Sequence, residues 1–175
     1  RLLNGAHSPL AYVGLRLGHE TVAEAMGDPA LAGFVERMMR QDIAASLPAT
    51  PGLDVAAYIG AVLTRFRNPA IAHRLAQIAW DGSQKLPFRI LETVAEALAA
   101  GRPVTRLALP IAAWIHFLRA RARSGEAITD PLAETLLDLG RRMTGDPAGD
   151  VAPAGDGVLA PEVTRRVLDR PTRSA

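Results

Sequence analysis

The sequence predicts an all-α protein, and three observations support this prediction. Apolar residues recur every three or four positions over most of the chain, and no stretch keeps the two-residue alternation of a half-buried strand. Asp or Asn stands directly before Pro at four points, a pair typical of helix starts because the first side chain caps free N–H groups and Pro fits the first helical position. Aromatic residues make up only 5% of the chain, so Leu, Ala, Ile and Val must supply the core. We expect about seven to nine helices.

Four of the expected helices begin at a capping residue and continue with apolar residues at helical spacing. Their spans are Asp28–Pro29 to Leu47, Asp54 to Phe66 with Tyr58 on the apolar face, Asn68–Pro69 to Ile78, and Asp130–Pro131 to Leu139. A fifth helix should start near Pro87 and end near Gly101, and a sixth should cover residues 107–123 and end near Gly125. The most apolar stretch, Leu107 to Leu118, is shorter than the roughly 20 residues that span a bilayer, so it predicts a buried helix.

The composition changes near the C-terminus. From about Thr144 to Ala160 the chain is rich in Gly, Pro, Asp and Ala, which is typical of a surface connection or a loose tail. Glu162 to Leu168 could form a last short helix. We therefore predict one helical domain over residues 1–144, followed by a Gly/Pro/Asp-rich connection and a short helix over residues 145–175.

Several classes of site are not visible in the sequence. The chain has no Cys, and its four His residues are far apart in sequence, so no group has the spacing of zinc ligands and we expect no metal. It has no G-x-G-x-x-G turn after a strand and no Walker-type loop, so we expect no nucleotide site in this chain itself. The absence of Cys and of a signal-peptide pattern favours a cytoplasmic protein with no membrane partner.

The positive charges do not indicate nucleic-acid binding. The net charge is only +2, and 19 of the 20 cationic residues are Arg, with Lys85 the single Lys. The arginines at 119, 121 and 123 spread around a helix instead of forming one stripe, and aromatic residues for base stacking are few. We expect solvated helix faces and no nucleic-acid partner, although a helical protein-interaction module remains an alternative function.

Two stretches carry candidate site residues. Asn4 and His7 are three residues apart, so on a helix they share a face and could polarise a carbonyl or hold a hydroxyl. A structural role is the alternative, because Asn-Gly is typical of a turn and Ser8-Pro9 of a helix start.

The second stretch, "QIAWDGSQKLPFR" from Gln77 to Arg89, leaves one helix at Trp80, turns through Asp81-Gly82-Ser83 and enters another helix near Leu86-Pro87. Its Lys and Arg could hold a carboxylate or the hydroxyls of a polar substrate. An ordinary capped turn with Lys85 in water is the alternative.

The two stretches together resemble the mannitol dehydrogenase family, the polyol-specific long-chain dehydrogenases and uronate reductases. "NGAHSPLAYVGLRLG" is similar to the start of that family's C-terminal domain, where Asn4 and His7 match the Asn and His of a K-x-x-x-x-N-x-x-H signature. "RFRNPAIAHRLAQIAWDGSQKLPFR" is similar to a second block, R-F-x-N…D-G-S-x-K, whose substrate-site Lys matches Lys85. The resemblance extends to about Thr144. The signature Lys would lie two residues before Arg1, so we expect this chain to be part of a longer protein.

The resemblance implies a fold and a set of roles. It implies a multi-helix substrate domain like that of 6-phosphogluconate dehydrogenase-like enzymes, preceded by a Rossmann-type domain that binds NAD or NADP, and a zinc-independent reaction. It implies that the signature Lys is the general acid/base, that Asn4 and His7 are catalytic partners that polarise the substrate oxygen, and that Lys85 binds substrate. The chain alone, which lacks that Lys and the cofactor domain, is expected to be inactive and to bind no NAD.

One departure from the family pattern bears on the substrate. Mannitol-type members carry Arg eight residues before the substrate-site Lys, where this chain has Gln77. Gln77 followed by "DGSQKLPxR" is more similar to the fructuronate reductase, or mannonate oxidoreductase, branch. A uronate has a carboxylate that Lys85 or Arg89 could bind, so we predict a substrate site formed by Lys85, Gln77, Asp81 and Arg89. Mannitol or another polyol is the alternative substrate.

Overall fold

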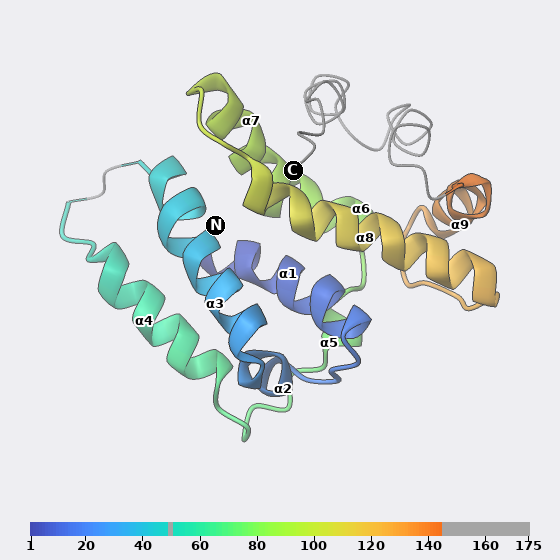
Figure 1. Ribbon diagram of the computed structural model, residues 1–175, viewed down its shortest axis with the longest axis horizontal. Coiled ribbons are helices and arrows are strands. Elements are labelled where there is room, and N and C mark those ends of the chain that lie inside the picture. Colours follow the sequence, from blue (N-terminus) through green and yellow to red (C-terminus); the bar gives the residue numbers. More distant parts are fainter. Residues whose placement is uncertain (49–50, 145–175) are drawn as a thin grey trace, which may run out of the picture.

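The computed structural model describes residues 1–48 and 51–144, and these residues are helical as predicted (Figure 1). The α-helices are α1 (Leu2–Arg16), α2 (Val22–Gly27), α3 (Pro29–Arg37), α4 (Val55–Phe66), α5 (Leu75–Ile78), α6 (Gly82–Leu86), α7 (Glu92–Ala99), α8 (Thr105–Ser124) and α9 (Ala133–Arg142). Helix α3 is extended by the π-turn η1 (Met38–Ile43) and the 3₁₀ turn η2 (Ala44–Ser46). A second π-turn, η3 (Pro87–Leu91), joins α6 to α7. Within the described ranges, β pairing is limited to one antiparallel bridge between Thr21 and Arg74.

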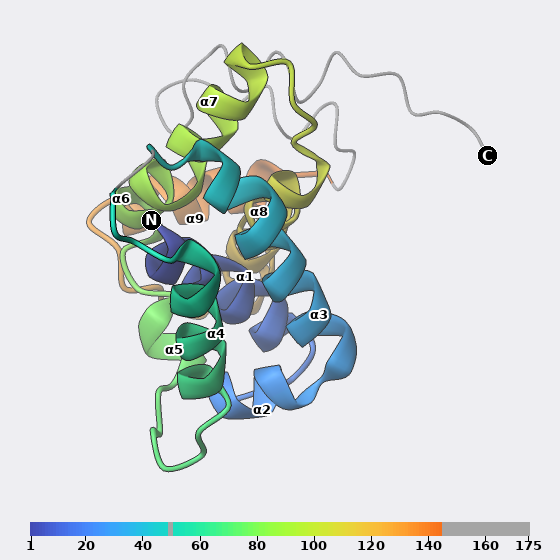
Figure 2. The same cartoon turned by 90° about the vertical axis from the view of Figure 1, so that its left-hand side faces the viewer.

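Helix α1 lies in the middle of the molecule, with α3 on one side and α8 crossing the other (Figures 1 and 2). It contacts α2, α3, α5, α8, η1 and η3, and most of its residues are buried. Two glycines allow these close contacts. A Cβ on Gly5 would lie 3.2 Å from the carbonyl oxygen of Arg89, and a Cβ on Gly14 would lie 2.7 Å from Leu75 Cδ1. Small residues on α1 therefore set the distance between the central helix and its neighbours.

Two of the predicted helix starts are confirmed by their capping bonds. Asp28 Oδ1 accepts from the backbone N–H groups of Ala30 and Leu31, and helical backbone continues from there to Ser46. Asp54 Oδ1 accepts from the N–H of Ala57 at the start of α4. Tyr58, which the pattern placed on the apolar face of α4, is instead exposed.

The helix predicted directly after Asn68–Pro69 begins late, at Leu75. Asn68 Oδ1 does accept from the N–H of Ala70, but only a turn follows. The backbone before Leu75 is extended because it pairs with the segment that precedes α2: the N–H of Val22 donates to His73 O, and the N–H of Leu75 donates to Glu20 O. Tertiary pairing therefore overrides the local helix signal.

The helix predicted to start near Pro87 starts earlier, at Gly82, so the predicted position was wrong. Asp81 has a left-handed backbone (φ 55°), and helical backbone runs from Gly82 to Ala99 through the π-turn η3. Pro87 lies inside this run, where the shift to π-helical bonding accommodates its missing N–H. The carboxylate of Asp130 caps this start from 47 residues away: it accepts from the Ser83 N–H (2.9 Å) and from the Ser83 hydroxyl (2.6 Å).

The predicted apolar helix is confirmed as α8, which ends at Gly125 with a left-handed backbone (φ 73°). Helix α9 lies against its C-terminal half, where Gly140 approaches the carbonyl oxygen of Leu118. In the part of the chain that is described, no helix combines the length and the apolar character that a membrane crossing requires. The predicted connection and the short helix at Glu162 to Leu168 lie outside the described residues.

Replacing Gly82 by Ala should destabilise the fold. A Cβ at Gly82 would lie 2.5 Å from Trp114 Nε1 and 2.6 Å from the Tyr12 hydroxyl, so the start of α6 would have to move away from α1 and α8. We expect Gly82→Ala to lower the free energy of unfolding by about 1–3 kcal/mol in urea titrations.

Gly60→Ala is the matched control. Gly60 lies inside α4 with no atom near its Cβ position, so Ala there should stabilise the helix by up to about 1 kcal/mol. Equal effects of the two substitutions would contradict the close packing at Gly82.

Candidate functional site

The site is organised around His7, which α1 holds in the interior. The His7 side chain is 9% exposed, whereas Asn4, one turn earlier on the same helix, is exposed. The imidazole of His7 therefore lies below the surface and the amide of Asn4 at the surface, about one helical turn apart. Neither the turn at Asn4-Gly5 nor the helix start at Ser8-Pro9 is formed, because α1 runs through both; the catalytic roles of Asn4 and His7 stay predictions.

Two aromatic rings from the end of α4 and the following loop contact His7. The Phe66 ring centroid is 5.2 Å from that of His7, and the His73 ring meets His7 edge to face at 5.4 Å. A cavity of about 50 Å³ adjoins this group, and it is lined by His7, Val22, Arg65, Phe66, Ile71 and His73. The His7 ring is therefore fixed in orientation and has a small open volume beside it.

The environment keeps His7 neutral. Burial lowers the pKa of His7, the charges of Arg89, His73, Arg65 and Lys85 act in the same direction, and together they bring it to about 4. At neutral pH the imidazole thus carries one N–H that can donate to an oxygen, and it holds no transferable second proton. This suits polarisation of a carbonyl better than general acid catalysis.

Lys85 lies at the end of α6 and faces Asp81, four residues earlier, with 3.6 Å between Lys85 Nζ and Asp81 Oδ2. Both side chains are partly exposed. Asp130 caps Ser83 and thereby holds the start of α6 in place. This contact also positions Asp81 and Lys85, which lie at the two ends of α6. As expected for an ordinary capped turn, the start of α6 is capped, but the capping carboxylate is that of Asp130, which lies far from the turn in sequence.

Arg89 lies in η3, one turn beyond Lys85, and is half-buried. Its Nε is buried and, within the described residues, has no hydrogen-bond partner. Burial lowers the pKa of the guanidinium, which nevertheless remains charged. A buried N–H without a partner is costly unless an acceptor meets it, so the Nε of Arg89 makes this guanidinium a candidate for binding a carboxylate.

The predicted residues are brought together in part. The charges of Lys85 and Arg89 reach His7 and lower its pKa, and Asp81 pairs with Lys85. Gln77 is exposed on α5, and no described contact connects it to His7. Its predicted role in substrate binding therefore stays a prediction.

Sequence reasoning assigned no role to Arg65, Phe66 and His73, although they surround His7. Arg65 and Phe66 stand in the R-F-x-N block, but nothing in that block indicates which way the residues point. His73 approaches His7 only because the 71–75 segment pairs with residues 20–22. Such pairing leaves no local sequence signal.

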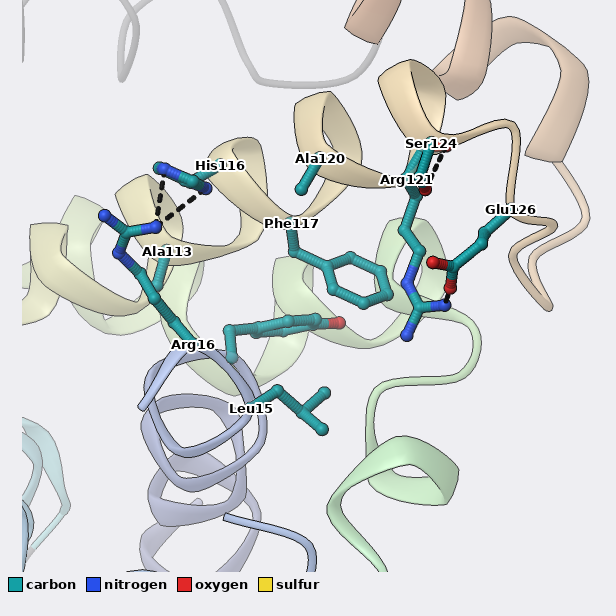
Figure 3. A pocket seen from close by; sticks show the side chains of 10 residues that line it. Leu15, Arg16, Ala113, His116, Phe117, Ala120, Arg121, Ser124 and Glu126 are labelled. Atoms are coloured by element: carbon teal, nitrogen blue, oxygen red, sulfur yellow. Dashed lines mark hydrogen bonds and ion pairs between the residues drawn. The ribbon is translucent and has the colours of Figure 1, made fainter. Parts of the chain in front are cut away.

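A larger cavity, of about 350 Å³, lies between the second half of α1 and α8 (Figure 3). Its two guanidiniums already have partners: Arg16 Nη1 contacts Nε2 of His116 at 2.6 Å, and Arg121 pairs with Glu126 and stacks over the Phe117 ring. None of the residues predicted for the site lines it. In the described part of the chain, no group of three or more His, Asp or Glu could hold a metal ion.

Comparisons with known proteins identify similar chains. A family model described as the mannitol dehydrogenase C-terminal domain matches residues 1–151. The mannitol 2-dehydrogenase of Phaeosphaeria nodorum is 38% identical over 138 residues, which are 78% of this chain and 24% of that protein. The D-mannonate oxidoreductase of Escherichia coli K12 is 41% identical over 147 residues, which are 83% of this chain and 30% of that protein.

Solved structures show the same likeness. Pseudomonas fluorescens mannitol 2-dehydrogenase, in a ternary complex with NAD and D-mannitol, superimposes with a TM-score of 0.80 at 30% identity, covering 95% of this chain and 35% of that one. A substrate-free D-sorbitol dehydrogenase superimposes with a TM-score of 0.78 at 26% identity, covering 96% of this chain and 36% of that one. The chain thus spans about a quarter to a third of the length of these relatives.

The buried, neutral state of His7 predicts a pH dependence of stability. Its pKa is about 4 in the folded protein and 6.5 in the unfolded chain, so the unfolded state binds more protons between these values. The neutral His7 contributes about 3 kcal/mol to the free energy of unfolding above pH 6.5, and this contribution is lost as the pH falls through 4. Urea titrations from pH 7.5 to pH 4 should measure this loss. In His7→Phe, the free energy of unfolding should depend less steeply on pH.

Leu109→Phe is the control, because Leu109 is an exposed residue of α8 without a titratable group, and its replacement should leave the dependence of the free energy of unfolding on pH unchanged. If the free energy of unfolding depended on pH equally steeply in His7→Phe and in the unsubstituted protein, this would contradict a buried, neutral His7.

Proposed function

Because the chain belongs to the mannitol dehydrogenase C-terminal domain family, we propose that it is the substrate-binding domain of an NAD(P)-dependent oxidoreductase. Residues 1–144 form this domain in the proposal. The reaction interconverts a sugar alcohol or aldonate and its keto form, with D-mannonate and D-fructuronate as the favoured pair. Mannitol, or another polyol oxidised at carbon 2, is the alternative substrate.

The charge balance around His7 is the observation that favours an acidic substrate. Arg65, Lys85 and Arg89 all act on His7, whereas Asp81 is the acidic group that pairs with one of them. The buried Nε of Arg89 is without a partner among the described residues. The carboxylate of mannonate or fructuronate could pair with one of these cations, which a neutral polyol cannot do. The similarity to the Escherichia coli D-mannonate oxidoreductase agrees with this preference.

The residues of this chain have complementary roles in the proposal. Neutral His7 donates its N–H to the carbonyl oxygen of the keto substrate, and Asn4 donates its amide to the same oxygen, so that negative charge developing there is stabilised. Lys85 and Gln77 bind substrate hydroxyls, and Asp81 orients Lys85. Arg89 binds the carboxylate. His7 has no proton to give at neutral pH, so the proton for the new hydroxyl comes from another group, the Lys that the family signature places before Arg1.

No cofactor site is evident in residues 1–48 and 51–144. The sequence has no Gly-rich phosphate-binding turn, and the guanidiniums in the cavity between α1 and α8 are already paired. In the proposal NAD or NADP is held by a preceding domain of the longer polypeptide, where it supplies the hydride. No metal takes part. The present chain contributes only the substrate half of the site.

The charge argument is tested with the full-length enzyme. We expect reduction of D-fructuronate to be preferred over reduction of D-fructose, assayed with NADH and with NADPH. Arg89→Ala should raise KM for fructuronate by about 10- to 100-fold, the effect of losing a charge-assisted pair, and leave KM for fructose unchanged.

Arg123→Ala, at an exposed position of α8, is the matched control and should change neither constant. An unchanged KM for fructuronate in Arg89→Ala would remove Arg89 from the carboxylate site. A preference for fructose in the unsubstituted enzyme would favour the polyol alternative.

The 175-residue chain by itself should bind no NADH in the micromolar range, because it lacks a phosphate cradle. Isothermal titration at neutral pH measures this, with the full-length enzyme as the positive control. Saturable micromolar binding to the short chain would show that the cofactor site includes residues of this domain.

A further inference from the structure

The cavity beside His7 has a size and lining that suit a small end group of the substrate. Its volume of about 50 Å³ is a few times the 10–15 Å³ or so that a single water requires, which is far too little for a six-carbon chain. Two imidazoles and the Arg65 guanidinium supply polar atoms, and Val22, Phe66 and Ile71 supply apolar ones. A group with one carbon and one hydroxyl matches this mixed lining.

The walls of the cavity are held firmly. The carbonyl oxygen of His73 accepts from the Val22 N–H at 3.0 Å, and the His73 N–H donates to Ile71 O at 2.7 Å. The bridge between Thr21 and Arg74 fixes the same segment from the next residue. Phe66 is buried against His7. The position of His73 relative to His7 is therefore set by the backbone, and the cavity between them has a defined size.

The polar groups of this cavity are available. Arg65 makes no ion pair or side-chain hydrogen bond with any residue of the described ranges, although it lines the cavity beside two imidazoles. Lys85 and Arg89, which come from α6 and η3, are not among the lining residues. Two groups of donors therefore act on His7: Arg65 at the end of α4 and His73 in the α4–α5 connection form one, and Lys85 and Arg89 form the other.

Substrate chemistry supplies an end group of the right size. Oxidation of a sugar alcohol next to its terminal carbon leaves a ketone with a hydroxymethyl group on one side and the rest of the chain on the other. With the carbonyl oxygen at His7, the two arms leave the carbonyl carbon in different directions, so the short arm can enter the cavity while the long arm extends away from it.

We propose that His73 and Arg65, together with His7, form a subsite for the hydroxymethyl arm of the keto substrate, while the long arm extends toward Lys85 and Arg89. This inference rests on the proposed oxidoreductase function, whose ketone carries a terminal hydroxymethyl group next to the carbonyl, and it adds the residues that bind this group. The His73 imidazole and the Arg65 guanidinium bind the hydroxyl, and Phe66 and Val22 contact its carbon.

The experiment compares two ketones that differ only in the short arm. The full-length enzyme is assayed with its preferred ketose and with the 1-deoxy analogue, in which a methyl group replaces the hydroxymethyl group. We expect kcat/KM to fall at least tenfold for the analogue, because the polar groups of the cavity would lose their partner. His73→Phe should abolish most of this discrimination by lowering kcat/KM for the ketose alone.

His73→Gln keeps a donor of similar reach and should retain most of the discrimination between the two ketones. If His73→Phe fails to fold, Arg65→Met serves in its place and should also reduce this discrimination. His116→Phe is the control that should resemble the unsubstituted enzyme. Equal kcat/KM for the two ketones in the unsubstituted enzyme would overturn the subsite and leave the proposed function standing. Failure to reduce any ketone would overturn both, whereas a preference for neutral ketoses with the discrimination retained would overturn only the choice of an acidic substrate.

Discussion

The burial of α1 on nearly all sides is the constraint on which the rest of the structure depends. A helix that six other elements contact must carry small residues where they approach, and Gly5 and Gly14 meet that need. The same burial removes water from His7 and lowers its pKa to about 4. Packing and chemistry are therefore coupled: a looser α1 would expose the imidazole, raise its pKa and weaken the neutral N–H donor that the site provides.

Contacts between residues far apart in sequence position Lys85 and Arg89, the two cations of α6 and η3. Asp130 caps Ser83 at the start of α6, and Gly82 lets that start lie against Tyr12 and Trp114. These contacts hold Lys85 and Arg89 next to α1, although the residues that make them touch no substrate in our proposal. On the other side, Asp42 and Arg106 form a two-bond ion pair that ties η1 to α8. The proposed site thus depends on two long-range contacts, the cap at the start of α6 and the ion pair between η1 and α8.

In our proposal, the electrostatics of the site suit an oxygen-rich, acidic ligand. The charges of Arg65, Lys85 and Arg89 reach the neutral imidazole of His7, and Asp81 pairs with Lys85. The proposed site would stabilise negative charge on a substrate oxygen, while the proton comes from another group. The chain spans about a third of the length of the relatives that it matches.

The sequence by itself determined the helical class, the capped starts at Asp28 and Asp54, the α8 helix with its end at Gly125, and the family, through two motifs at the correct spacing. These signals are local, since capping, apolar periodicity and motif spacing depend on neighbours within a few residues. Only the tertiary structure decided that helix α5 starts at Leu75, that Pro87 lies inside a helix, and that Phe66 and His73 enclose His7. The physical reason is that each of these depends on pairing or packing between segments far apart in the chain, from the bridge at Thr21 and Arg74 to the cap that Asp130 provides for Ser83.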